Sequence, residues 1–140
     1  MGLKRTRNGK RTLGMAMVEM VFVLPLLLLL VFAIAEFGLM FSRWLTLSNA
    51  VREGARAGVA WRGPNCNPAT VENDVQTIAG NYARAGGVPL ANNAFTVTGA
   101  CDGAGTDLVV TASYNFQLHI PFATLSSVPL AYQSSMRNEL

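Results

Sequence analysis

The sequence has very little of the chemistry that metal centres and enzymes need. It contains one histidine, His119, and two cysteines, Cys66 and Cys101, which form no CxxC motif. Since a structural zinc site usually takes four Cys or His ligands, we expect no metal and no cofactor. His119 precedes Ile120 in an apolar stretch and has no neighbouring group that would make it a general base. The glycines of residues 99–105 are followed by neither a lysine nor a helical pattern, so they form no phosphate loop. We therefore expect no enzymatic activity.

Charged residues are also scarce, and they are unevenly distributed. They make up 14% of the 140 residues, against 51% hydrophobic residues, which excludes a disordered chain. Five of the eleven basic residues precede residue 12, with no acid among them: Lys4, Arg5, Arg7, Lys10 and Arg11. A short basic arm beside an apolar run is more typical of a membrane-insertion signal than of a nucleic-acid-binding arm. No nucleic-acid partner is expected.

One long apolar run dominates the N-terminal part. Residues 15–35 contain a single charged residue, Glu19, and as a helix they would span about 31 Å, close to the thickness of a bilayer core. The positive-inside rule places the N-terminus in the cytoplasm and the remainder outside. The sequence thus predicts a basic leader at 1–14, a transmembrane helix at 15–35, an extracytoplasmic continuation of the helix at 36–62 and a small head at 63–140.

The leader allows three interpretations. It is an uncut signal anchor, or a secretory signal cut after the small-x-small segment 33–35, or a leader cut after Gly14. In the third case Met15 gains a positively charged amine, and Glu19 of a neighbouring subunit could neutralise it. A carboxylate in a membrane helix costs roughly 2.5 kcal/mol or more and so usually has a partner. The alternative is that Glu19 lies near the interface and reaches water there.

Several segments resemble a known family. They are the basic leader with Gly14, the segments 15–19, 18–30, 36–38 and 50–58, and the C-terminal segment 134–139. The leader and residues 15–19 resemble the class III signal of type IV prepilins. Together the segments are similar to TadE-like proteins, the pseudopilins or minor pilins of the tight-adherence (Tad) system that builds Flp pili. Met15 stands where type IVa pilins commonly have phenylalanine. Met20 stands where major Flp pilins often have tyrosine, which favours a minor subunit.

This resemblance implies a function. It implies cleavage between Gly14 and Met15 by the prepilin peptidase, a register role for Glu19 in assembly, and a non-enzymatic minor pilin that supports adhesion. The implied partners are the prepilin peptidase, a TadF-like pseudopilin, the major Flp pilin and the Tad platform of the bacterial inner membrane. The head would be periplasmic or extracellular. The alternative is a single-pass membrane-tethered or secreted binding module unrelated to pili.

The sequence pattern after residue 35 predicts an α+β fold, in which the long helix is followed by one helix and a roughly three-stranded antiparallel sheet. The first helix is expected to continue to about Arg62, and the second to start at Pro68 after an Asn67 cap and to stop at Gly86. Strand-like runs cover 94–98, 107–116 and 130–136. Cys66 and Cys101, in an oxidising compartment, could close a loop of 36 residues, or stay as two unpaired thiols.

Patterns on the two helices indicate which faces are packed. Glu36, Arg43, Ala50 and Ala57 recur every seven residues and so lie near one face. Small residues recur every four residues at Ala50, Gly54 and Gly58, a spacing that permits close helix packing. Arg52, Glu53 and Arg56 could form a solvated face. The apolar stripe of the second helix is expected to be core: Val71, Val75, Ile78, Ala79 and Tyr82.

Overall fold

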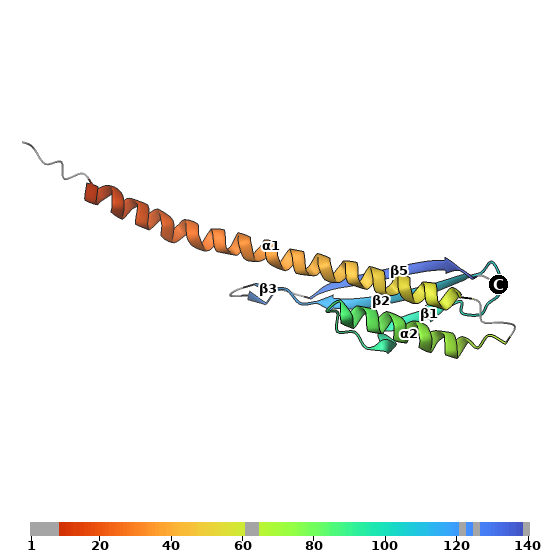
Figure 1. Ribbon diagram of the computed structural model, residues 1–140. Coiled ribbons are helices and arrows are strands. Elements are labelled where there is room, and N and C mark those ends of the chain that lie inside the picture. Colours follow the sequence, from red (N-terminus) through yellow and green to blue (C-terminus); the bar gives the residue numbers. More distant parts are fainter. Residues whose placement is uncertain (1–8, 61–64, 121–122, 125–126, 139–140) are drawn as a thin grey trace, which may run out of the picture.

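A computed structural model describes residues 9–60, 65–120, 123–124 and 127–138. One long helix, α1 (Gly9–Val59), projects from a small head that lies beside its C-terminal third (Figure 1). The head contains α2, a short 3₁₀ helix η1, and five strands. Their bounds are α2 Pro68–Ala85, η1 Asn92–Ala94, β1 Phe95–Thr98, β2 Asp107–Phe116, β3 His119–Ile120, β4 Ala123–Thr124 and β5 Val128–Arg137. The expected α+β class is confirmed.

The main sheet has three antiparallel strands in the order β1-β2-β5. β2 and β5 pair along ten residues each, from Asp107 opposite Arg137 to Phe116 opposite Val128. β5 begins at Val128, two residues before the expected strand. It contains Pro129, which has no N–H to donate, and the sheet tolerates this residue because β5 is an edge strand. β1 has four residues, so the last four residues of β2, 113–116, pair with β5 alone. Strands β3 and β4 form a separate short pair.

Helix α1 has an exposed N-terminal part and a buried C-terminal part. It runs through Pro25 without interruption and ends at Val59, earlier than the expected Arg62; residues 61–64 lie outside the described part. From Leu47 onward it supplies core residues, among them Ala50, Val51 and Ala55, all 0% exposed. This part packs against α2, β2 and β5. The head is thus built on the last turns of the same helix that carries the apolar run.

Helix α2 begins as expected but buries a different face from the expected stripe. The Asn67 side chain accepts a hydrogen bond from the Ala69 amide at 3.0 Å, and Pro68 occupies the first turn. Val71, Val75 and Ala79 are buried, but Ile78 and Tyr82 are 37% and 43% exposed. The expectation was wrong for these two because the buried face rotates along the helix. It passes from the Val71 side to its last buried residues, Ala79, Gly80 and Ala83.

Candidate functional site

The expected processing and assembly residues lie on the exposed part of α1. Gly14, Met15 and Glu19 are all exposed, and Met15 is 77% exposed. A β-carbon added at Gly14 would meet no other atom within 4 Å. Within the described residues, no hydrogen bond or ion pair engages the Glu19 carboxylate. The structure brings none of these three residues near the head.

The surface around these residues is a continuous apolar sleeve, which we define as the exposed large apolar side chains of α1 between Met15 and Leu45. Phe22 is 75% exposed and Leu26 is 72% exposed. An 18-residue window within this helix has a mean hydropathy of 2.8, and none of its residues is buried inside the molecule. The helix is therefore long and apolar enough to cross a membrane. A monomer in water rarely exposes such an area, so the apolar sleeve requires a lipid or protein cover.

Residues 14–56 match the family model of TadE-like proteins. This segment is TadE-like. The match covers the apolar sleeve and most of the core-forming part of α1. It stops before α2 and the sheet, so the head is outside it. Neither a curated protein nor a solved structure shows a significant match to the chain.

Two of the three small residues of α1, Gly54 and Gly58, lie against α2 of the same chain. Ala50, Gly54 and Gly58 are all buried. A β-carbon at Gly54 would stand 3.0 Å from Ala79 Cβ, and one at Gly58 would stand 2.8 Å from Val75 Cγ2. The strip therefore permits a close α1–α2 approach within the molecule. This face of the TadE-like segment is covered by its own head.

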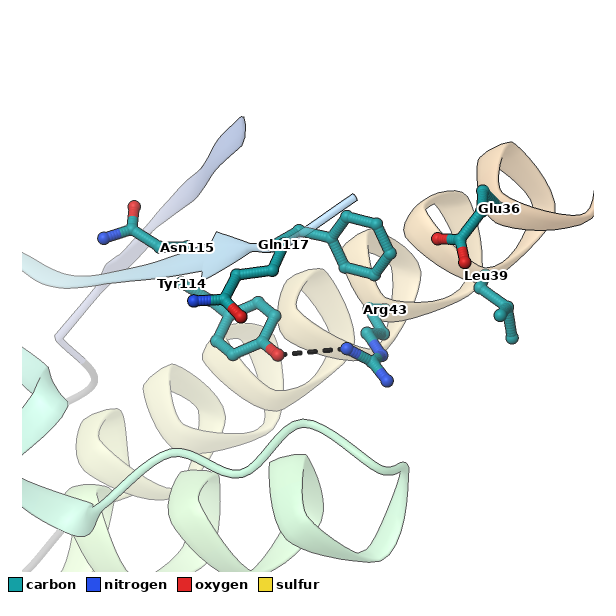
Figure 2. Close-up of a pocket in the computed structure, with 7 residues that line it drawn as sticks. Glu36, Leu39, Arg43, Tyr114, Asn115 and Gln117 are labelled. Carbon is teal, nitrogen blue, oxygen red and sulfur yellow. Dashed lines mark hydrogen bonds between the residues drawn. The ribbon is translucent and has the colours of Figure 1, made fainter. Parts of the chain in front are cut away.

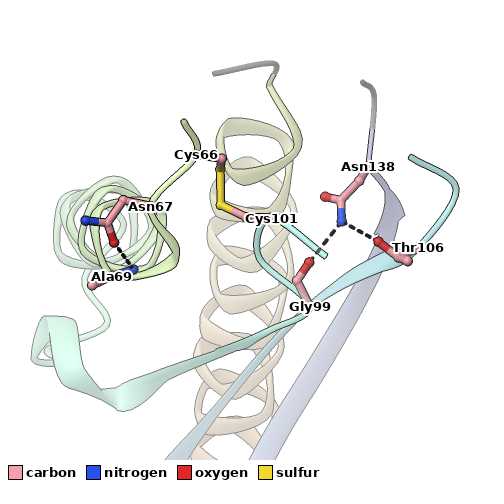
Figure 3. Close-up of a disulfide and its surroundings, with 7 residues drawn as sticks. All are labelled: Cys66, Asn67, Ala69, Gly99, Cys101, Thr106 and Asn138. Carbon is pink, nitrogen blue, oxygen red and sulfur yellow. Dashed lines mark hydrogen bonds between the residues drawn. A yellow bond between two sulfur atoms is a disulfide. The ribbon is translucent and has the colours of Figure 1, made fainter. Parts of the chain in front are cut away.

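The two cysteines are joined in a disulfide, 35 residues apart in sequence (Figure 3). Cys66 immediately precedes the cap of α2, and Cys101 lies in the loop between β1 and β2. The Asn138 side chain holds the same loop by donating hydrogen bonds to Gly99 O and Thr106 Oγ1, both at 2.9 Å. The end of the head farthest from the apolar sleeve is thus tied across three segments. Sequence patterns gave no signal for the role of Asn138.

A tyrosine on β5 connects the sheet to the TadE-like segment. Arg52 Nε donates a hydrogen bond to the Tyr132 hydroxyl at 2.9 Å, and its guanidinium carbon lies 5.4 Å from the ring centroid. Trp44 meets the same ring edge-on, with centroids 6.2 Å apart. Hydrogen bonding to Ser48, and then to Arg52, lowers the pKa of Tyr132 below its ordinary value of 10.0. Arg52 is exposed, as a solvated face predicts, but it also has a defined partner in Tyr132 that the sequence did not indicate.

A cavity of about 340 Å³ opens where the apolar sleeve meets the head (Figure 2). It lies between α1 and the C-terminal end of β2 and is lined by Glu36, Leu39, Arg43, Tyr114, Asn115, Phe116 and Gln117. Arg43 Nη1 donates a hydrogen bond to the Tyr114 hydroxyl at 3.1 Å, and its guanidinium carbon lies 5.0 Å from the centre of the Phe116 ring. We call this the junction cavity. The seven-residue spacing of Glu36 and Arg43 was the one signal of it in the sequence.

The described residues offer no alternative chemical centre. No group of three or more His, Cys, Asp or Glu side chains among them is placed to hold a metal ion. The described residues instead offer packing surfaces on the TadE-like segment, a disulfide-closed head beyond it and a polar cavity where the two meet.

Proposed function

We propose that this chain is a minor pilin, or pseudopilin, that acts without catalysis in assembly of Flp-type pili by the Tad system and so supports adhesion. Residues 15–35 would anchor it in the bacterial inner membrane, with the N-terminus in the cytoplasm and the head outside. One observation carries this proposal: the TadE-like match falls on a helix whose apolar sleeve is left uncovered by its own head.

Processing after Gly14 is the first step of the proposed mechanism. Gly14 lies inside α1, where a glycine costs roughly 1 kcal/mol relative to alanine. No contact among the described residues requires a glycine there, because a β-carbon would meet open space. Because the helix is less stable at Gly14, it unfolds more readily there, which would expose the Gly14–Met15 peptide bond to a peptidase. The prepilin peptidase is accordingly the first proposed partner.

Assembly follows through the apolar sleeve. After cleavage the amine of Met15, four residues before Glu19, carries a positive charge. The exposed Glu19 carboxylate of a neighbouring subunit would neutralise that charge. The face of α1 that carries Gly54 and Gly58 is already covered by α2, so neighbouring subunits would meet along the apolar sleeve instead. The proposed neighbours are a TadF-like pseudopilin, the major Flp pilin and the inner-membrane Tad platform.

The deciding experiment measures the intact mass and N-terminal residue of the protein taken from its native membrane. A chain that begins at Met15 supports prepilin-type processing. A chain that begins at Glu36 would make it a secreted domain and remove Glu19 from the mechanism. A chain that keeps residues 1–14 would contradict the processing step and leave a membrane-anchored assembly factor that does not polymerise.

A further inference from the structure

We propose that the short β3–β4 pair is a second membrane contact, which lies in the headgroup layer of the bilayer beside α1. In this pair His119 lies opposite Thr124, and Ile120 lies opposite Ala123. The inference rests on the membrane anchoring proposed above and adds to it a contact between the head and the lipid surface. Such a contact would fix the orientation of the head over the bilayer, because interfacial anchors help to set the tilt of a membrane helix.

Strand β2 leads the chain back along α1 toward the apolar sleeve. Near the start of β2, Leu108 lies beside Gly58, where an added β-carbon would stand 2.7 Å from Leu108 Cδ2. At the end of β2, the centre of the Phe116 ring lies 5.0 Å from the guanidinium carbon of Arg43. β2 therefore runs antiparallel to α1. The chain then continues toward the N-terminal, apolar part of α1, and β3 lies beyond the end of β2 on that side (Figure 1).

The distance from Phe116 to β3 matches the distance from Arg43 to the membrane. Arg43 lies eight residues beyond Ala35, about 12 Å along the helix axis. With residue 35 at the edge of the hydrocarbon core, Arg43 stands outside the headgroup layer, which is roughly 5–8 Å thick. The four residues from Phe116 to Ile120 span at most about 14 Å when extended, and half of this reach already brings Ile120 to the headgroup layer. Strand β3 stays beside α1 at this level, since the two elements are in contact.

The composition of this part of the chain suits a lipid surface. Residues 108–136 contain no Asp, Glu, Lys or Arg, so no permanent charge has to enter the membrane surface with the pair. Ile120 and Ala123 are apolar, and Thr124 is small and uncharged. His119 has an imidazole, which combines an apolar body with a polar tip and so fits a boundary between lipid and water.

The backbone of the pair determines how deep the contact lies. Within the described residues, β3 and β4 form a two-stranded sheet of their own, so the outer edge of each strand has backbone groups without a partner in a sheet. Unpaired backbone groups are costly in hydrocarbon, whereas the headgroup layer supplies water and polar partners. The geometry therefore places the pair among the headgroups and outside the hydrocarbon core.

The proposal is tested with the full chain in phosphatidylcholine vesicles that contain brominated lipid, because bromine quenches tryptophan fluorescence only at close contact. Ile120→Trp and Ala123→Trp each place a probe in the pair, one on each strand. Lipid brominated near the carboxyl end of its acyl chains should remove most of the emission that each variant adds to that of the native chain. Lipid brominated near the methyl end should remove less, because the pair lies above the hydrocarbon core.

Gln133→Trp is the matched control. Gln133 is exposed on β5 and pairs with Thr111, which precedes Phe116 on β2 and so lies farther from the membrane. The emission that this variant adds should resist both lipids. Circular dichroism checks that each variant is folded, and the two positions in the pair test the contact independently.

Two outcomes overturn the proposal without affecting the anchoring. One is that vesicles carry the chain on flotation but the added emission of Ile120→Trp and Ala123→Trp resists both lipids. The other is that Gln133→Trp is quenched as strongly as the variants of the pair. A chain that does not float with the vesicles would contradict the proposed anchoring and the lipid contact together.

Discussion

Gly54 of α1 and Ala79 of α2 lie so close that a β-carbon on Gly54 would stand 3.0 Å from Ala79 Cβ. The Val75 carbonyl oxygen would be 3.3 Å away, so backbone as well as side chain lies opposite the glycine. This contact seats the head on the TadE-like helix, because both residues belong to the buried face shared by α1 and α2.

Gly54→Ala should therefore destabilise the head by about 1–3 kcal/mol, the usual cost of overpacking a tight core. Urea unfolding followed by the fluorescence of Trp44, which contacts Tyr132, measures the loss. Gly38→Ala is the matched control, because a β-carbon at Gly38 meets nothing within 4 Å on the same helix. It should be neutral or slightly stabilising. Equal stability of the two variants would show that α1 and α2 are not so closely apposed.

The Cys66–Cys101 disulfide should supply a large share of the head's stability. Closing a loop of this length contributes about 4 kcal/mol by constraining the unfolded chain. Reduction should lower the melting temperature of the head by on the order of 15 °C or more. The measurement is thermal unfolding with and without reductant. The Cys66→Ser/Cys101→Ser double variant should melt like the reduced protein and be indifferent to reductant; an unchanged melting temperature on reduction would contradict the expected stabilisation.

The sequence predicted the elements whose signals are local. The Asn67 cap, the Pro68 start and the strand-like composition of 107–116 act within a few positions, and the structure confirms the helix and strand they predict. The apolar run likewise identified the sleeve of α1 without any partner.

The contacts between distant segments could not be read in the same way. Arg43 meets Tyr114 across 71 residues, and Arg52 meets Tyr132 across 80. Neither tyrosine is marked by a periodic pattern, so Arg52 looked like an ordinary helix-surface charge and the partner of Arg43 could not be identified. The small-residue strip was visible, but its partner, α2 of the same chain, depended on the tertiary fold.

Tyr132 should ionise at a lower pH than an ordinary tyrosine, because hydrogen bonds from Ser48 and Arg52 favour its phenolate. Between this lowered pKa and 10.0 the folded chain has lost a proton that the unfolded chain retains. Raising the pH through that window should therefore increase the stability of the head. Ultraviolet titration of tyrosinate absorbance follows the ionisation directly.

Substitutions assign this titration. Tyr132→Phe should remove the earliest ionisation step, and Arg52→Gln should shift that step to higher pH. Tyr82→Phe is the control, since Tyr82 is an exposed tyrosine of α2. An early step that persists in Tyr132→Phe would show that another group is responsible.

Glu19→Ala should impair pilus assembly while leaving membrane insertion intact or improved. A carboxylate within a membrane helix costs roughly 2.5–3.5 kcal/mol, so its removal favours insertion and harms only a step in which the charge has a partner. Membrane fractionation reports the first effect, and electron microscopy of surface pili reports the second.

Two further variants separate charge from bulk at this position. Glu19→Gln should reproduce the defect, because the amide keeps the shape but cannot neutralise the Met15 amine. Glu53→Ala removes an exposed carboxylate from the head-bearing end of the same helix and should assemble normally. Normal piliation by Glu19→Ala would refute the pairing and favour the membrane-tethered binding module, in which the helix serves as an anchor alone.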